Sequence, residues 1–482
     1  MSDCDPSYCM SRRWRDECGV FGIFAPGADV ARVAYFGLFA LQHRGQESAG
    51  IAVGDGHKID HHVDLGLAFQ VFDEDIIRRL MGHVALGHVR YSTMGSNIIP
   101  NAQPMVGEHR SGPFALGHNG NLVNAGVLRR DLEHEGVIFY GSSDTEVMAK
   151  LIQRSQAPTI EGAIEDLMHR VEGAYALGII TPDSLIAVRD PQGVRPLCIG
   201  KLNGAGYVIA SESAALTTVG ADFLREVQPG EMVTCDADGM RSVQVMESPR
   251  RSACIFEFIY FARPDTHIAG KNVYMSRVRM GEMLAQQCNV PADLVVPIPE
   301  TGIPAAIGFA AESGTPFGEA FIKNRYIFRT FISPDQRLRE LGVRMKLSPL
   351  KEAINGRRLV VVDDSIVRGT TTRPEVELLR AAGAKEIHLR ICCPPIKFPC
   401  FYGIDTSAGQ KELIAAQHSV EAIRQRVGAD SLEYLSMDNL VKAVGLPKAN
   451  FCTACFDGDY PIEVPPDVRV TKFDLEHPPT ET

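Results

Sequence analysis

The sequence lacks any apolar run approaching the ~18–20 residues that a membrane-spanning helix needs. It also lacks an excess of positive charge, because 49 Lys and Arg are set against 59 Asp and Glu, a formal net charge of −10. General nucleic-acid binding requires a basic surface, so this balance argues against it. The N-terminal stretch MSDCDPSYCMSRRWRDE has no apolar centre of the kind found in secretory signals. These absences predict a cytoplasmic protein with neither a membrane nor a nucleic acid as partner.

Cysteine, in contrast, is plentiful, with 12 residues in 482. Disulfides are not expected in a long chain without a secretory signal. The remaining roles for these thiols are buried apolar packing, metal ligation and nucleophilic catalysis. The positions of the cysteines must therefore be judged one motif at a time.

The chain divides into a polar leader and two parts with different patterns. Residues 1–17 are polar and show no periodicity. From 18 to about 250, short apolar strands such as 18–25 alternate with few helical segments, which favours stacked sheets with helices outside. From about 290, strand–loop–helix repeats predict a parallel sheet, whose ligands bind at the carboxyl ends of the strands. The boundary is expected near 250–270.

Polar clusters follow several strands of the first part. They are CGVFGI from Cys18, QHRGQESAG (42–50), HVRYST (88–93), GHNGN (117–121) and SSDTE (142–146). Each cluster alone is ordinary turn chemistry, and Cys18 alone has the alternative of a small buried apolar residue. In this order they resemble the glutaminase domain of the N-terminal-nucleophile amidotransferases, over about 18–250. The resemblance implies a four-layer αββα fold and cleavage of the Glu17–Cys18 bond.

That resemblance assigns a role to each cluster. Cys18 would be the nucleophile, and its freed α-amine, with a pKa of about 7.7–8.0, would accept the thiol proton. Arg90 would bind the α-carboxylate of glutamine, and Asp144 its α-ammonium. Asn119 and Gly120 would form the oxyanion hole. Arg44 and Gly45 would belong to the adjoining loop that closes over glutamine.

The second part contains LVVVDDSIVRGTTT (359–372), an apolar strand that ends at two adjacent carboxylates. One interpretation is a capped helix after a strand. Adjacent carboxylates repel each other, however, so a role in binding a cation or sugar hydroxyls is favoured. The glycine, the threonines and the helix start that follow suit a phosphate.

This stretch resembles the phosphoribosyl-pyrophosphate loop of type I phosphoribosyltransferases, which have a parallel-sheet fold. Asp363 and Asp364 would bind the ribose hydroxyls. The residues implied around the 5-phosphate are Ser365, Val367, Arg368, Gly369, Thr370, Thr371 and Thr372. Those implied around pyrophosphate are Glu300, Thr301 and Gly302, with Lys323 and Arg325 from the basic segment 323–340 and Arg344 just after it. The alternative for that segment is a solvated charged segment. One Mg²⁺ per subunit would be held near Thr301, Asp363 and Asp364.

The combination of the two parts resembles the glutamine phosphoribosylpyrophosphate amidotransferases over about 18–460. The implied product is 5-phosphoribosylamine, formed in the first committed step of purine synthesis, with purine nucleotides as feedback inhibitors and a homotetrameric assembly. The implied divisions are a removed propeptide (1–17), a glutaminase domain (18–255) and a phosphoribosyltransferase domain (256–482). A non-catalytic nucleotide sensor and an amidotransferase with another acceptor are the alternatives, and the intact motifs at both sites argue against them.

A third candidate site is formed by cysteines near the C-terminus. CTAC places Cys452 and Cys455 two residues apart, and Cys254 and Cys400 are the further ligand candidates. Four thiolates can hold zinc or an iron–sulfur cluster, and the spacing does not decide between them. The family resemblance implies a structural [4Fe–4S] cluster on these four residues. Cys392 and Cys393 are interpreted as buried strand residues, with ligation as the alternative.

Overall fold

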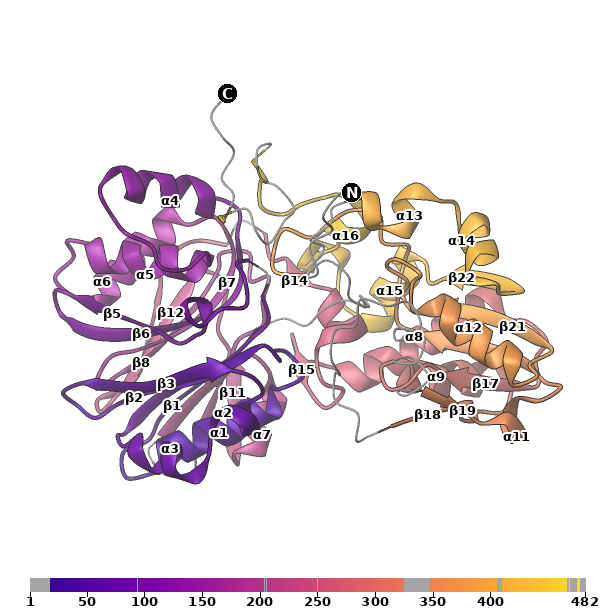
Figure 1. Ribbon diagram of the computed structural model, residues 1–482, viewed down its shortest axis with the longest axis horizontal. Coiled ribbons are helices and arrows are strands. Elements are labelled where there is room, and N and C mark those ends of the chain that lie inside the picture. Colours follow the sequence, from indigo (N-terminus) through magenta and orange to yellow (C-terminus); the bar gives the residue numbers. More distant parts are fainter. Residues whose placement is uncertain are drawn as a thin grey trace, which may run out of the picture.

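The computed structural model describes residues 18–92, 94–202, 204, 206–248, 250–324, 347–404, 410–465, 468 and 475–476. The predicted propeptide 1–17 lies outside these residues. Two bodies of different architecture lie side by side, the first in indigo to magenta and the second in pink to yellow (Figure 1). Within the described ranges, no helix is both long and apolar enough to cross a membrane.

The first body contains two stacked antiparallel sheets. The seven-stranded sheet has the order β11-β9-β10-β1-β4-β2-β3, and the six-stranded sheet has the order β13-β12-β8-β7-β6-β5. The strands of the first sheet are β1 (Gly19–Phe24), β2 (Ser48–Gly54), β3 (Ile59–Leu65), β4 (Val84–Arg90), β9 (Cys198–Leu202), β10 (Gly206–Ala210) and β11 (Ala221–Glu226). Those of the second are β5 (Met105–His109), β6 (Gly112–Leu122), β7 (Gly173–Ile180), β8 (Leu185–Arg189), β12 (Glu231–Asp236) and β13 (Gly239–Gln244).

Helices cover the outer face of each sheet. Those over the seven-stranded sheet are α1 (Val30–Ala40), α2 (Ala68–Val71), α3 (Glu74–Arg79) and α7 (Ser213–Thr218). Those over the six-stranded sheet are α4 (Ala125–His134), α5 (Asp144–Arg154) and α6 (Ile160–Arg170). Apolar side chains fill the space between the two sheets as well. The predicted αββα layering is confirmed.

Capping side chains set where the helices of this body begin. Asp29, Ser143 and Thr159 each accept a hydrogen bond from a backbone N–H in the first turn of α1, α5 and α6. Such caps satisfy donors that the helix cannot pair itself. The cap at Ser143 fixes the first residue of α5, Asp144, which is one of the predicted site residues.

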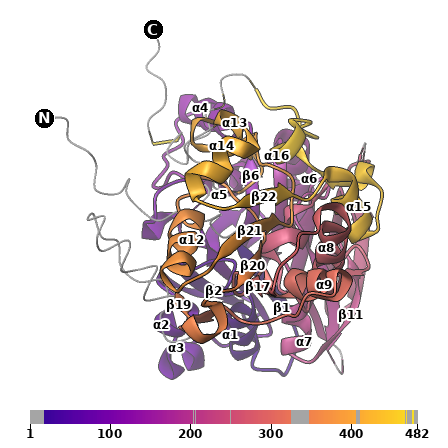
Figure 2. The same ribbon diagram turned by 90° about the vertical axis from the view of Figure 1, so that its right-hand side faces the viewer.

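The second body is built on a four-stranded parallel sheet with the order β17-β20-β21-β22. Its strands are β17 (Leu294–Pro297), β20 (Arg358–Asp363), β21 (Glu386–Ile391) and β22 (Ser431–Tyr434). The main helices are α8 (Val273–Cys288), α9 (Ile303–Ser313), α12 (Thr372–Ala381), α14 (Val420–Val427) and α15 (Met437–Val444). Figure 2 shows α8 and α9 on one side of the sheet and α12 on the other. The predicted parallel sheet is confirmed.

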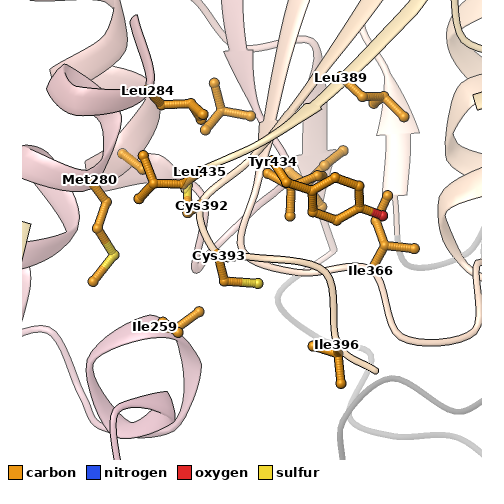
Figure 3. Packing of buried hydrophobic residues seen from close by; sticks show 14 of the residues in the cluster. Ile259, Met280, Leu284, Ile366, Leu389, Cys392, Cys393, Ile396, Tyr434 and Leu435 are labelled. Atoms are coloured by element: carbon orange, nitrogen blue, oxygen red, sulfur yellow. The ribbon is translucent and has the colours of Figure 1, made fainter. Parts of the chain in front are cut away.

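Short elements complete the second body. They are β14 (Ala253–Cys254) paired with β23 (Phe451–Cys452), β15 (His267–Ile268) with β16 (Lys271–Asn272), β18 (Phe321–Lys323) with β19 (Leu347–Pro349), a π-helical turn (Glu257–Phe261), α11 (Lys351–Ile354), α13 (Ile414–Gln417) and α16 (Ala454–Asp457). Cys392 and Cys393 directly follow β21. Both are buried among apolar side chains such as Met280 and Leu435 (Figure 3), so the interpretation is right about their burial, although they lie just beyond the strand.

Candidate active sites

Cys18 lies at the start of the central strand of the seven-stranded sheet. Its side chain is buried, and its thiol donates a hydrogen bond to the carbonyl oxygen of Tyr91 at 3.3 Å. Burial raises the pKa of Cys18 to about 11. Because the thiolate is the nucleophilic form, a thiol in this setting needs a nearby base before it can attack.

Asn119 and Gly120 lie on β6 of the other sheet, close to the end of β4. The two sheets touch here, since the His88 ring of β4 lies 3.0 Å from the carbonyl oxygen of His118. Asn119 is 1% exposed, and its side-chain nitrogen has no hydrogen-bond partner among the described residues. A buried donor left unpaired costs about 1–3 kcal/mol, and the predicted role of Asn119 as an oxyanion donor would supply the missing acceptor.

Gly120 can only be glycine. Its φ is +147°, and a Cβ at this position would lie 2.0 Å from the carbonyl oxygen of Ala174 on the neighbouring strand β7. The backbone of β6 therefore approaches β7 more closely than any side chain permits. The two predicted oxyanion donors are thus adjacent on one rigid strand.

Arg90 and Asp144 lie next to Cys18 but already have internal partners. The Arg90 guanidinium donates to the carbonyl oxygens of Met94 at 2.8 Å and of Gly95 and Ser96 at 3.3 Å. Asp144 accepts a hydrogen bond from the backbone N–H of Leu122 at 3.0 Å. Burial opposes ionisation of Asp144, but the nearby His118 ring and the backbone donors outweigh it and lower its pKa.

Arg44 is 1% exposed and lies behind Cys18. Its guanidinium donates to Glu212 at 2.5 Å and to Glu257 at 2.7 Å, and its Nε donates to the Cys18 carbonyl oxygen at 3.2 Å. Glu257 belongs to the second body, so Arg44 links the nucleophile to that body. Gly45 packs against β4, because a Cβ there would lie 2.5 Å from the Val89 carbonyl. The contacts of Arg44 support positioning of Cys18, and its predicted place in a loop over glutamine stays a prediction.

Arg44→Met should lower the free energy of unfolding by about 3–5 kcal/mol, because it leaves the Glu212 and Glu257 carboxylates buried without their cation. Urea unfolding of the purified variants measures this difference. Arg241→Met is the matched control, since Arg241 pairs with Glu161 and Asp236 at the surface with 53% of its side chain exposed. An exposed ion pair contributes at most about 1 kcal/mol. Equal effects of the two substitutions would contradict a structural role for Arg44.

The acidic pair lies at the carboxyl edge of the parallel sheet. Asp363 ends β20, and Asp364 accepts hydrogen bonds from the Thr301 hydroxyl and, at 2.5 Å, from the Ser365 hydroxyl. Both carboxylates are mostly buried. Because β17 and β20 are adjacent parallel strands, the turn Glu300–Gly302 and the acidic pair meet at one edge. The structure therefore brings together the residues predicted around ribose and pyrophosphate.

The loop after Asp364 leads into α12, as predicted. Gly369 has a φ of +72°, which glycine adopts at little cost. Thr371 at the N-cap makes no side-chain capping bond, and α12 has 10 residues. The first-turn N–H groups of such a helix are suited to a phosphate. Arg368 is engaged in an ion pair with Glu412 at 2.6 Å.

The basic segment is only partly described. Lys323 ends β18, and its ammonium lies 3.4 Å from the Glu300 carboxylate, at the edge of the predicted pyrophosphate turn. Arg325 and Arg344 lie outside the described residues. Their predicted contact with pyrophosphate stays a prediction.

The four predicted cluster cysteines come from three separate stretches of the chain. Cys254 and Cys452 are direct neighbours in the β14–β23 pair, Cys455 lies in α16, and Cys400 accepts the Tyr402 N–H at 3.4 Å. Burial raises the pKa of Cys452 to about 12, and the pKa of Cys455 well above its ordinary value, where Cys254 and Cys400 add to the effect. Thiols in this environment become thiolates only with a positively charged partner such as iron.

Within the described ranges, no group of three or more His, Cys, Asp or Glu side chains is arranged to hold a metal ion. A mononuclear zinc site needs all its sulfurs about 2.3 Å from one point. Cysteine ligands of a [4Fe–4S] cluster each bind a different iron atom, so they are held further apart. Cys254, Cys400 and Cys452 all lie close enough to Cys455 to raise its pKa. That the four together hold a cluster stays a prediction.

Two residues near Cys18 carry contacts that sequence analysis did not single out. The Glu47 carboxylate accepts hydrogen bonds from the backbone and hydroxyl of Ser92, at the start of the loop that Arg90 holds. Nδ1 of His118 lies 3.7 Å from Oδ1 of Asp144. Glu47 lies inside the cluster 42–50 and His118 inside the cluster 117–121. Their position beside residues with assigned roles is the sequence feature that could have identified them.

Comparisons with known proteins support both halves of this picture. A family model described as a glutamine amidotransferase domain matches residues 88–218. The amidophosphoribosyltransferase of Mycobacterium tuberculosis is 50% identical over 475 residues, which cover 96% of this chain and 90% of that protein. The chain belongs to the amidophosphoribosyltransferase family. The family member from Bacillus subtilis is 49% identical and covers 93% of this chain and 95% of its own length.

Solved structures of amidophosphoribosyltransferases share the whole fold. The glutamine phosphoribosylpyrophosphate amidotransferase from B. subtilis, solved with ADP and GMP, covers 94% of this chain and 100% of its own with a TM-score of 0.89 and 48% identity. A structure described as the allosteric regulatory enzyme of purine biosynthesis has a TM-score of 0.90. The predicted activity, amide transfer from glutamine to the sugar diphosphate, is confirmed at the level of the family. The roles of single residues stay predictions.

Proposed function

We propose that this chain releases ammonia from glutamine at Cys18 and transfers it to C1 of 5-phosphoribosyl 1-pyrophosphate. The products are 5-phosphoribosylamine, pyrophosphate and glutamate, in the first committed step of purine synthesis. The observation that carries the proposal is that one chain holds a buried Cys18 thiol and an unpaired Asn119 side-chain nitrogen in one domain, and an acidic pair beside the 300–302 turn in the other.

In the first half-reaction, the Cys18 sulfur attacks the amide carbon of glutamine and its proton passes to the α-amine of the same residue. The Asn119 amide and the Gly120 N–H stabilise the oxyanion that forms. The amide nitrogen leaves as ammonia with the returned proton, and water hydrolyses the thioester to glutamate. The high pKa of the Cys18 thiol supports the need for that amine, and therefore removal of residues 1–17.

Glutamine itself is held by the two charged side chains beside the thiol. Arg90 binds its α-carboxylate and Asp144 its α-ammonium, which the lowered pKa of Asp144 favours. Binding requires Arg90 to exchange carbonyl oxygens of the 94–96 loop for a carboxylate, a stronger acceptor. The residues of that loop then close the site.

In the second half-reaction, ammonia attacks C1 of the sugar as the C1–O bond to pyrophosphate breaks. Asp363 and Asp364 bind the ribose hydroxyls, and the start of α12 with its loop binds the 5-phosphate. Glu300, Thr301 and Gly302, with Lys323, Arg325 and Arg344, surround the departing pyrophosphate. Mg²⁺, held near Thr301, Asp363 and Asp364, neutralises charge on pyrophosphate oxygens when bound.

The remaining parts of the proposal concern assembly and control. Residues 18–255 and 256–482 form the glutaminase and phosphoribosyltransferase domains. A [4Fe–4S] cluster on Cys254, Cys400, Cys452 and Cys455 cross-links the C-terminal segment when bound. Purine nucleotides inhibit the enzyme, which is a cytoplasmic homotetramer. The complex of the B. subtilis relative with ADP and GMP supports the nucleotide part.

The decisive experiment supplies anaerobically purified protein, with its N-terminus verified by mass spectrometry, with glutamine, the sugar diphosphate and Mg²⁺. Pyrophosphate and glutamate should appear in equal amounts, and a chelator should stop pyrophosphate release. Glutamate formation without pyrophosphate would contradict the assigned acceptor. Pyrophosphate release that does not depend on glutamine or ammonia would contradict the transfer.

A further inference from the structure

The second domain touches the first at the predicted oxyanion hole. Gly403, in the loop after β21, has a φ of +110°. A Cβ at Gly403 would lie 3.0 Å from Nη2 of Arg195, 3.1 Å from the carbonyl carbon of Gly120 and 3.2 Å from the Cα of Gly120. The two backbones therefore meet directly, and a glycine at each position makes the contact possible.

Polar contacts hold the segment 401–403 in this place. Arg195, which is fully buried, donates from its Nε to the Tyr402 carbonyl oxygen at 2.9 Å. Asn121, next to Gly120, donates from its side chain to the Phe401 carbonyl oxygen at 3.0 Å. The Tyr402 hydroxyl donates to the Ile462 carbonyl oxygen at 2.5 Å. The bonds from Arg195 and Asn121 thus hold the two residues before Gly403 against the first domain.

Gly120 is confined from the opposite direction as well. It pairs with Tyr175 in the register of β6 and β7, and its missing Cβ faces the Ala174 carbonyl. The peptide of Gly120 is therefore enclosed between β7 and the segment 401–403. An N–H that stabilises an oxyanion must be held in place before the charge forms, because reorientation during the reaction costs free energy.

We propose that Gly403 is a positioning residue for glutamine hydrolysis: it contacts the Cα and the carbonyl carbon of Gly120 from the second domain, and so holds in place the residue that carries the N–H. The inference rests on the proposed function, in which that N–H is an oxyanion donor. A methyl group at position 403 would crowd both the Arg195 guanidinium and the Gly120 backbone. A small shift of Gly120 would weaken stabilisation of the transition state more than binding of the substrate.

The test compares Gly403→Ala with Gly239→Ala. Gly239 has nearly the same φ, +113°, but its missing Cβ has nothing within 4 Å, so it reproduces the backbone strain without the contact. We expect kcat for glutamine hydrolysis to fall about 10–100-fold in Gly403→Ala, below the ~10²–10³ for loss of a whole oxyanion donor. In Gly403→Ala, the KM for glutamine and the rate of ammonia-dependent synthesis should each change less than about twofold. In Gly239→Ala, all of these activities should change less than about twofold.

A second readout separates positioning from general damage. The γ-aldehyde analogue of glutamine reacts with Cys18 by forming an S–C bond while the C=O π bond breaks, and the resulting oxygen occupies the oxyanion hole. Its inhibition constant should rise by the factor by which kcat falls, whereas that of glutamate should not move. An equal rise in the inhibition constants of the aldehyde and of glutamate would overturn the positioning role.

Asn121→Ala provides a milder variant, because it removes the bond to Phe401 and keeps both glycines. The same pattern at smaller amplitude is expected, and it decides the matter if Gly403→Ala does not fold. An unchanged kcat in Asn121→Ala, or an equal loss of kcat in Gly403→Ala and Gly239→Ala, would overturn the role of Gly403 and leave the proposed function standing. Absence of glutamine hydrolysis by the parent protein would instead overturn the proposed function.

Discussion

Cys18→Ala should abolish glutamine-dependent pyrophosphate release, by at least about 10⁴-fold, as removal of a covalent nucleophile does in other acyl-transfer enzymes. Synthesis from an ammonium salt should continue within about twofold. The reason is spatial: Cys18 lies at the start of β1 in the first domain, whereas the acidic pair lies at the edge of the parallel sheet in the second. Ammonia supplied from solution needs only the second site.

The matched control is Cys198→Ala. Cys198 is also a buried thiol of the first domain, and it also donates to a carbonyl oxygen, that of Ala210 at 3.2 Å. Its substitution should leave both activities intact, because it lies on β9 away from the polar clusters. Pyrophosphate release with each nitrogen source is the measurement. Equal loss of the two activities in Cys18→Ala would refute its assigned role.

Asp364→Asn should reduce synthesis from both glutamine and ammonia by about 10–150-fold, the value of one charge-assisted hydrogen bond of ~1.5–3 kcal/mol. Asparagine keeps the size of the side chain and one acceptor for Thr301 or Ser365, so the loop should stay folded. What it loses is the negative charge that sugar hydroxyls and a nearby cation require. Asp363→Asn should behave in the same way.

Asp293→Asn is the control for this pair. Asp293 precedes β17 at the opposite edge of the same sheet and pairs with Arg358 at 2.8 Å. Its substitution should leave synthesis unchanged. Isothermal titration with the sugar diphosphate, together with pyrophosphate release, separates binding from turnover. Full activity of both Asp363→Asn and Asp364→Asn would contradict a role for the acidic pair in binding the sugar diphosphate.

Local pattern was sufficient to predict much of the fold. The apolar run 18–25 contains β1, the segment 143–155 contains α5 with its Ser143 cap, and the run 359–362 lies within β20, which the loop and α12 follow. In each case the side chains that decide the element are its own or its immediate neighbours. Cys18 and Asp363 border strands that the sequence marks clearly, but their roles came from the resemblance of the surrounding motifs to known families.

Long-range partners could not be predicted in this way. Arg44 stands in a motif that suggests a substrate loop, but its carboxylates come from positions 212 and 257. Gly403 stands in an ordinary turn, and only the packing of two domains gives it Gly120 as a neighbour. The local sequence does not encode either contact, because each joins residues that are far apart in the chain and depends on how distant parts of the structure pack together.

The buried position of Arg44 also limits how the protein can be rebuilt. Its second carboxylate, Glu257, lies just beyond the proposed 255/256 division, in a turn that Arg277 holds through the carbonyl oxygens of Phe258 and Ala262. In a chimera joined at that division, Arg44 would come from one parent protein and its partner at position 257 from the other. Recombination between relatives therefore has to carry the 257–262 turn together with the glutaminase half, so the unit of exchange extends beyond the sheet boundary.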